Sequence, residues 1–127
     1  MDKKALITAF WRDVAEQNAA GLRRYFAEDA VIRWHNTNEL FTVEEYILAN
    51  CEYPGTWMGE MERLVEGIEG TIITVVRVHD PEESGSVHAT SFIRLEAGQI
   101  VEMDEYWGDD GRIPKWRQDK KIGRQIK

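Results

Sequence analysis

The second half of the chain contains four segments with the pattern of β-strands, separated by short turns. Two of the segments alternate in hydrophobicity, and the others are rich in β-branched residues. The four segments are residues 57–66, 71–79, 86–95 and 100–107. Turns at Gly70, at residues 80–85 and at Ala97-Gly98 connect them, and such short connections join antiparallel neighbours. The pattern predicts a four-stranded antiparallel meander.

The first half of the chain has mainly helical periodicity. Apolar residues recur at three- and four-residue spacing between Ala5 and Ala19, which predicts one helix with a buried stripe. A second short helix is predicted over residues 22–26, and a strand over residues 31–36. Thr42 and Glu45 stand at capping-box spacing, so a third helix is expected from Val43 to about Asn50.

Helices followed by strands indicate an α+β fold. We expect three N-terminal helices packed on a strongly curved, mainly antiparallel sheet that forms a cone with an internal pocket. The 127 residues suit a single domain, residues 1–127, in which residues 110–127 form a loop or tail.

The charge of the chain disfavours two classes of partner. Sixteen Lys and Arg side chains against 23 Asp and Glu give a net charge of −7. Phosphate backbones and anionic membrane surfaces repel such a domain, so neither nucleic acid nor a membrane is expected as a partner. The single Cys51 cannot form an internal disulfide, and the first ten residues lack the apolar core of a signal peptide. A cytoplasmic protein is therefore expected.

Two stretches resemble a known superfamily. RRYFAEDAVIRWHN follows the first helix and SFIRLEAGQIVEMDEYW lies near the end. Their order and spacing resemble the nuclear transport factor 2-like superfamily, which includes ketosteroid isomerases and SnoaL-like polyketide cyclases. The resemblance covers residues 6–107 and implies a cone fold, a small-molecule pocket and a dimer. Because the superfamily includes both enzymes and binding modules, the fold does not define the function.

The ketosteroid isomerase machinery is not matched at its three chemical positions. Alignment on residues 26–30 places Phe10 where those enzymes carry an oxyanion-binding Tyr, Trp34 at the general-base Asp, and Ser91 at the protonated Asp. A dienolate would find neither the base nor the strong donors that it needs. We expect no ketosteroid isomerisation by that machinery.

The same alignment implies that Ser91 faces the cavity, and the inward set of the last strand is then Val101, Met103, Glu105 and Trp107, because strand side chains alternate. A carboxylate among apolar neighbours has a raised pKa and suits general acid or base catalysis. The alternative is that Glu105 forms an ion pair with Arg63. If the alternation is shifted by one residue, Asp104 and His88 become the acid–base pair instead.

The pocket is expected to be lined mainly by aromatic side chains, because rings with a polar atom suit a flat apolar ligand. The candidate ligand-binding residues are Phe10, Trp34, Asn36, Tyr53, Trp57, Arg63, Ser91, Met103 and Trp107. No histidine stands at metal-ligand spacing with a cysteine or carboxylate, so neither a metal nor another cofactor is expected.

Two functional hypotheses follow. The first is a cofactor-free acid–base enzyme of the cyclase, dehydratase or isomerase type, acting on a small hydrophobic molecule. The second is a non-catalytic ligand-binding or dimeric assembly module. A homodimer is expected in both cases, because Phe92 and Tyr106 would lie exposed on the outer face of the sheet.

Overall fold

The computed structural model describes residues 2–127 and begins with two helices, α1 (Lys3–Ala15) and α2 (Ala19–Arg23). Asp2 caps α1 by accepting a hydrogen bond from the backbone N–H of Ala5 at 2.8 Å. The Asn18 side chain caps α2 in the same way, through the N–H of Gly21. Because this cap starts a new helix, the predicted end of the first helix at Ala19 is wrong, and the second helix begins and ends three residues earlier than predicted.

The next segment forms the edge of the sheet and the third helix. Strand β1 (Phe26–Trp34) begins at a residue that was predicted to be helical. A short strand that was not predicted, β2 (Glu39–Thr42), pairs antiparallel with β1. Helix α3 (Val43–Cys51) follows at once, and the predicted capping box between Thr42 and Glu45 is confirmed.

The predicted four-stranded meander is confirmed. It comprises β3 (Met58–Glu66), β4 (Thr71–His79), β5 (Ser86–Glu96) and β6 (Gln99–Asp109). The sheet order is β2-β1-β6-β5-β4-β3, in which β1 and β6 are parallel and the other neighbours antiparallel. This curved, mainly antiparallel sheet with its helices confirms the predicted α+β fold class.

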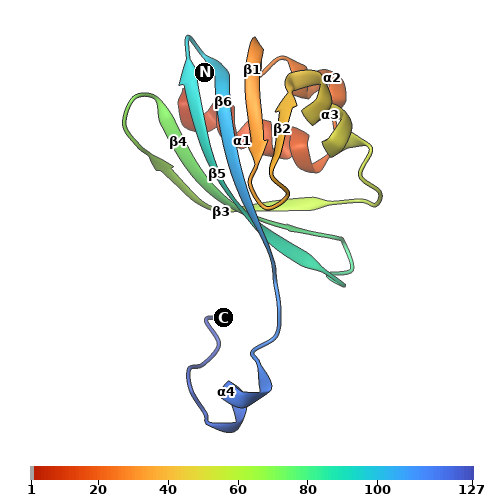
Figure 1. Cartoon of the computed structure of the whole chain (residues 1–127), viewed down its shortest axis with the longest axis vertical. Helices are drawn as coiled ribbons and strands as arrows, with labels where there is room; N and C mark the ends of the chain where they lie inside the picture. Colours follow the sequence, from red (N-terminus) through yellow and green to blue (C-terminus); the bar gives the residue numbers. More distant parts are fainter. Residues whose placement is uncertain (1) are drawn as a thin grey trace.

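The three N-terminal helices lie together on one face of the sheet (Figure 1). Helix α1 contacts β3 at one edge, whereas α3 contacts β1 and β2 at the other. The helices therefore enclose the inner face from both edges, and the apolar core fills the space between. None of the helices within residues 2–127 has the length and apolarity needed to cross a membrane.

Two irregularities change which side chains face inward. Regular alternation would place Val65 on the same face as Met61. Pairing slips between Met61 and Arg63, however, so Val65 is exposed and Leu64 turns toward the core. Pairing also slips between Arg94 and Leu95, and Ile100 is buried where Val101 was expected. Strand alternation predicts orientation only between such bulges.

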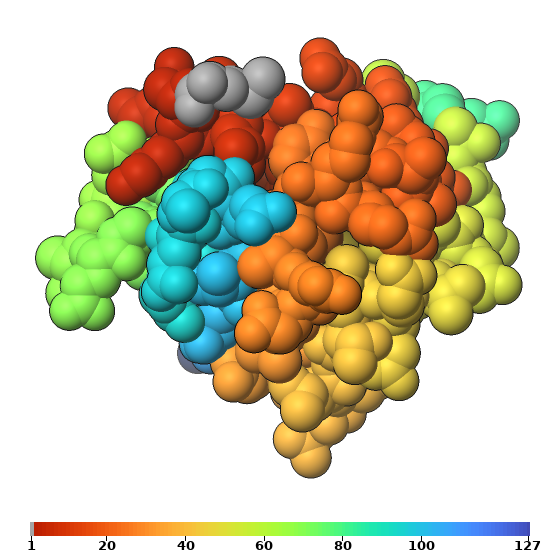
Figure 2. Space-filling model, turned by 90° about the horizontal axis from the view of Figure 1, so that it is seen from above, coloured from red at the N-terminus to blue at the C-terminus, as the bar shows by residue number. Residues whose placement is uncertain are grey.

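The turn between β5 and β6 closes the end of the molecule seen in Figure 2, where it lies between the N-terminal helix and β1. Ala97 and Gly98 both have positive φ angles, 51° and 77°, as a two-residue hairpin of this type requires. The backbone N–H of Ile100 donates to the carbonyl of Tyr25 at 2.8 Å, which ties the start of β6 to the start of β1.

Candidate functional site

Glu105 lies on the inner face of the sheet, as strand alternation predicted. It pairs with Ser91 of β5 on one side and with Trp34 of β1 on the other. The residue is only 1% exposed, whereas its neighbour Asp104 lies on the outer face. The slip in β6 occurs before Met103, so the alternation from there to Glu105 is regular.

Two neutral donors hold the Glu105 carboxylate. The Ser91 hydroxyl donates to Oε2 at 2.6 Å, and the Trp34 indole N–H donates to Oε1 at 3.0 Å. Arg63 is exposed on β3, and the ion pairs found among residues 2–127 do not include Glu105. The alternative of an Arg63–Glu105 ion pair is therefore wrong, because the bulge beside Arg63 turns that side chain outward.

Burial raises the pKa of Glu105 from 4.5 to about 7, although the hydrogen bonds from Ser91 and Trp34 lower it. Burial dominates because the two donors are neutral and carry no full positive charge to stabilise the carboxylate. A group with this pKa is present in both protonation states near neutral pH. It can therefore accept a proton or donate one.

Tyr46 of α3 is a part of this site that sequence reasoning missed. It is 1% exposed, and its ring packs edge-on against Phe26 and Trp34. Burial, followed by the charges of Glu105 and Cys51, raises the pKa of its hydroxyl well above 10, so the hydroxyl stays protonated. The signal was present in the sequence: Val43, Tyr46 and Ile47 form one apolar stripe of the capped helix.

Trp107 carries an unsatisfied donor. Its indole N–H is shielded from solvent and meets no acceptor among residues 2–127. The ring packs edge-on against Trp34 at 6.2 Å between centroids. Asn36, a predicted ligand-binding residue, forms two hydrogen bonds with the backbone of Trp107. Its Oδ1 accepts from the Trp107 N–H at 2.6 Å, and its Nδ2 donates to the Trp107 carbonyl at 2.5 Å. Asn36 therefore fixes the position of Trp107.

The fallback pair of Asp104 and His88 does not form. Asp104 lies on the outer face with His35 and Arg33, and the His35 Nε2 is 2.7 Å from its carboxylate. His88 contacts Glu62 and Asp110 instead. The register explains this outcome, because His88 pairs with Gly108, whereas Asp104 pairs with Phe92 further along β5.

The remaining predicted ligand residues divide between core and surface. Phe10 and Met103 are fully buried, and Phe10 packs edge-on against Trp11, Tyr25 and Phe26. Tyr53 is exposed and packs against Trp57. Of these four predicted residues, two belong to the core and two lie in the segment before β3.

Trp57 lines a groove of about 440 Å³ between α1 and the β3–β4 hairpin. Most of its lining is apolar, namely Trp11, Ala15, Trp57, Met58, Gly59, Met61 and Val76. Val76 pairs with Ala89, and Ala89 pairs with Trp107. Val76, which lines the groove, is thus joined to Trp107 by cross-strand pairing through Ala89. Glu105 lies two residues before Trp107 on β6 and pairs with Ser91.

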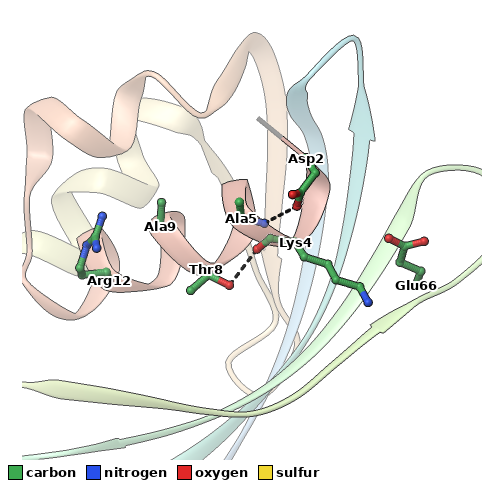
Figure 3. Close-up of a pocket in the computed structure, with 7 residues that line it drawn as sticks. All are labelled: Asp2, Lys4, Ala5, Thr8, Ala9, Arg12 and Glu66. Atoms are coloured by element: carbon green, nitrogen blue, oxygen red, sulfur yellow. Dashed lines mark hydrogen bonds between the residues drawn. The ribbon is translucent and has the colours of Figure 1, made fainter.

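A second hollow, of about 630 Å³, lies between the first turns of α1 and the end of β3. Figure 3 shows Lys4 extending from α1 toward the strand that carries Glu66. Lys4, Arg12 and Asp2 line this open hollow, and Glu105 does not. Within residues 2–127 no group of three or more His, Cys, Asp or Glu side chains could hold a metal ion.

Comparison with known proteins identifies the fold. No sequence family matches the chain, and no curated protein matches it. Solved structures do match. An NTF-2 like protein of unknown function from Burkholderia xenovorans is 18% identical with a TM-score of 0.77, over 98% of this chain and 94% of the other.

Two further matching structures carry provisional enzyme assignments. A Kribbella flavida protein provisionally assigned as a ketosteroid isomerase is 19% identical with a TM-score of 0.77, over 97% of this chain and 88% of that one. A Shewanella putrefaciens protein provisionally assigned as a SnoaL-like polyketide cyclase is 10% identical with a TM-score of 0.68, over 84% and 80%. The chain thus has the nuclear transport factor 2-like fold, as its sequence predicted; identities this low define the fold alone.

Proposed function

We propose that this protein binds a small, largely apolar molecule between α3 and the inner face of the sheet, and that Glu105 exchanges a proton with it. The observation that carries the proposal is the buried Glu105 carboxyl, held only by neutral donors and with a pKa of about 7. Burying an unpaired carboxyl disfavours folding at neutral pH, so a functional role would explain why it stays.

The surrounding groups fit cofactor-free acid–base chemistry on a carbonyl compound. As a carboxylate, Glu105 accepts a proton from a carbon next to the carbonyl and later returns it to the substrate. The Tyr46 hydroxyl stays protonated beside it, and the Trp107 N–H has no acceptor among residues 2–127. Both groups are suitable donors to a carbonyl oxygen that gains negative charge.

Access to Glu105 requires a movement of the site. Trp34 and Trp107 are partly buried, and Glu105 is almost fully enclosed beside them. We favour the apolar groove lined by Trp57 as the entrance. Val76 lines this groove, and Val76, Ala89 and Trp107 are cross-strand neighbours that connect it to the site. A cytoplasmic location, expected from the lone Cys51, remains part of this proposal.

The direct test is proton exchange. Cyclic ketones are incubated with the protein in D₂O, and deuterium incorporation next to the carbonyl is followed by NMR. We expect wild type to catalyse incorporation and Glu105→Gln to lose at least about 100-fold, the usual scale for a general base.

The matched control is Glu102→Gln, which makes the same chemical change on the same strand. Glu102 contacts Arg33 and Arg94, and its side chain is 36% exposed, so it lies outside the enclosed site. We expect this variant to keep the wild-type rate of incorporation. Equal rates for wild type and Glu105→Gln would contradict the proposal.

The second candidate is a dimeric assembly or binding module without catalysis. The enclosure of Glu105 and the exposed apolar side chains of the outer face favour it. It predicts thermal stabilisation by ketones, or dimerisation, without deuterium incorporation.

A further inference from the structure

The last 18 residues form an arm that leaves the domain. Figure 1 shows residues 110–127, including helix α4 (Lys115–Asp119), projecting beyond the end of β6. The arm starts at a fixed point, because the Asp110 N–H donates to the carbonyl of Ser86 at 3.1 Å and its carboxylate accepts from the Ser86 hydroxyl at 2.6 Å. Helix α4 has no buried residue. This helix lies within the stretch that was predicted to be a loop or tail.

Four apolar side chains of the arm remain exposed. Trp116 is 57% exposed, and Ile113, Ile122 and Ile126 are also exposed. Single exposed apolar residues are common on proteins, but four within 18 residues leave α4 without the apolar packing that normally stabilises so short a helix. A partner that covers this surface would supply that packing.

The charge of the arm is opposite to that of the domain. Residues 110–127 carry seven Lys and Arg against two Asp, a net charge of +5. Residues 1–109 carry nine Lys and Arg against 21 Asp and Glu, a net charge of −12. The end of the arm contacts its own domain, where Lys127 Nζ lies 3.4 Å from a Glu62 carboxylate oxygen. The same attraction acts between the arm and the acidic domain of a second copy.

We propose that the arm docks on a second copy of this chain, across the outer face of that copy's sheet. The outer face offers Phe92 and Tyr106, 41% and 45% exposed, to the apolar side chains of the arm. The acidic domain attracts the basic arm, whereas it would repel the phosphates of a nucleic acid at the same distance. The arm continues from β6, which carries Tyr106, so two sheets meeting at their outer faces would bring each arm onto the other copy. This inference does not depend on Glu105.

The test is whether the arm contacts another chain. Trp116 is replaced by the photo-crosslinking residue p-benzoylphenylalanine, and the protein is mixed 1:1 in ¹⁴N- and ¹⁵N-labelled forms before irradiation. We expect cross-linked peptides of mixed isotope composition, joining position 116 to the outer face. Cross-links found only within single chains would overturn the proposal, and so would preferential cross-linking to added DNA.

A second measurement uses affinity. The double variant Trp116→Ser/Ile122→Asp should raise the dimer dissociation constant at least about tenfold in sedimentation equilibrium. The control is Ile68→Asp, which makes the same apolar-to-acidic change at an 80% exposed residue in the β3–β4 turn. Equal dimer dissociation constants for the arm variant and the wild type would overturn the proposal, even though both proteins would then be dimers.

Discussion

At the level of single residues, the most unusual feature of the interior is a buried carboxyl group, Glu105, that is hydrogen-bonded only by neutral donors. Its two donors, Ser91 and Trp34, come from the strands on either side of β6. Neutral donors lower the pKa of a carboxyl less than a cation would, so the effect of burial remains dominant. This arrangement makes the stability of the fold depend on pH.

The first prediction is a fall in stability between pH 4.5 and pH 8. The pKa of Glu105 is raised from 4.5 to about 7 in the folded protein, so the folded state favours the protonated carboxyl. The resulting stabilisation is fully present below pH 4.5 and is lost as the pH rises through about 7. The shift corresponds to about 3 kcal/mol. Urea unfolding at a series of pH values should show a fall that is larger in wild type than in Glu105→Gln by about this amount, because His88 titrates in both proteins. A parallel fall in both proteins would exclude Glu105 as its cause.

The second prediction compares two tryptophans that pack against each other. Trp34→Phe removes a donor to Glu105 and should cost about 1–3 kcal/mol in the free energy of unfolding at pH 8, beyond the loss of ring volume. Trp107→Phe removes the same atoms, but its N–H has no acceptor among residues 2–127, so only the volume loss applies. Urea titrations of the two variants should differ accordingly. Equal destabilisation would show that the Trp34 bond contributes nothing measurable.

At the level of elements, His88 links three parts of the sheet. From β5 it contacts Glu62 on β3 and Asp110, the first residue after β6. The hydrogen bond with Asp110, together with the charges of Asp110 and Glu62, raises the pKa of His88 above 6.5 despite some desolvation. Arg77 on β4 and Lys127 of the arm are the cations near these carboxylates.

The third prediction concerns this link. A raised histidine pKa stabilises the fold fully below pH 6.5, and the contribution is lost as the pH rises through the folded pKa. The melting temperature should therefore decline more between pH 6 and pH 9 with His88 than with His88→Asn. Both proteins should carry the Glu105→Gln substitution, because Glu105 would otherwise titrate in the same pH range. Identical declines would show that the link adds no stability.

At the level of the whole molecule, the outer face of the sheet is left open by the three N-terminal helices, which all lie on the inner face (Figure 1). Phe92 and Tyr106 lie on the outer face in edge-on contact, and Tyr106 stacks on His35 at 4.4 Å between ring centroids. A face with apolar side chains at its centre and charged pairs around it is typical of a protein interface.

The fourth prediction is a homodimer through this face. Sedimentation at tens of micromolar should give the mass of two chains for wild type and of one chain for Phe92→Glu, because the new carboxylate would be buried without a partner. Ile68→Glu, at an exposed turn, is the control and should remain dimeric. A wild-type protein that sediments as one chain at these concentrations would contradict the prediction.

The sequence by itself determined most of the local structure, because local structure depends on near neighbours, although the boundary between the first two helices was misplaced. The capping box and the strands of the meander follow from spacings within one helix or strand, and the inward orientation of Glu105 follows from strand alternation once the resemblance places Ser91 inward. The short strand β2 and the start of β1 at Phe26 did not follow, because their hydrogen-bond partners lie elsewhere in the chain.

Only the tertiary structure decided which side chains meet Glu105. Bulges beside Arg63 and Val101 turn predicted inward residues away, and a bulge depends on how two strands pair. Tyr46 reaches the site because α3 packs on β1, and Trp57 lines a separate groove because it precedes β3 at the opposite edge of the sheet. Contacts between elements depend on the pairing of distant segments, which the pattern within each segment does not encode.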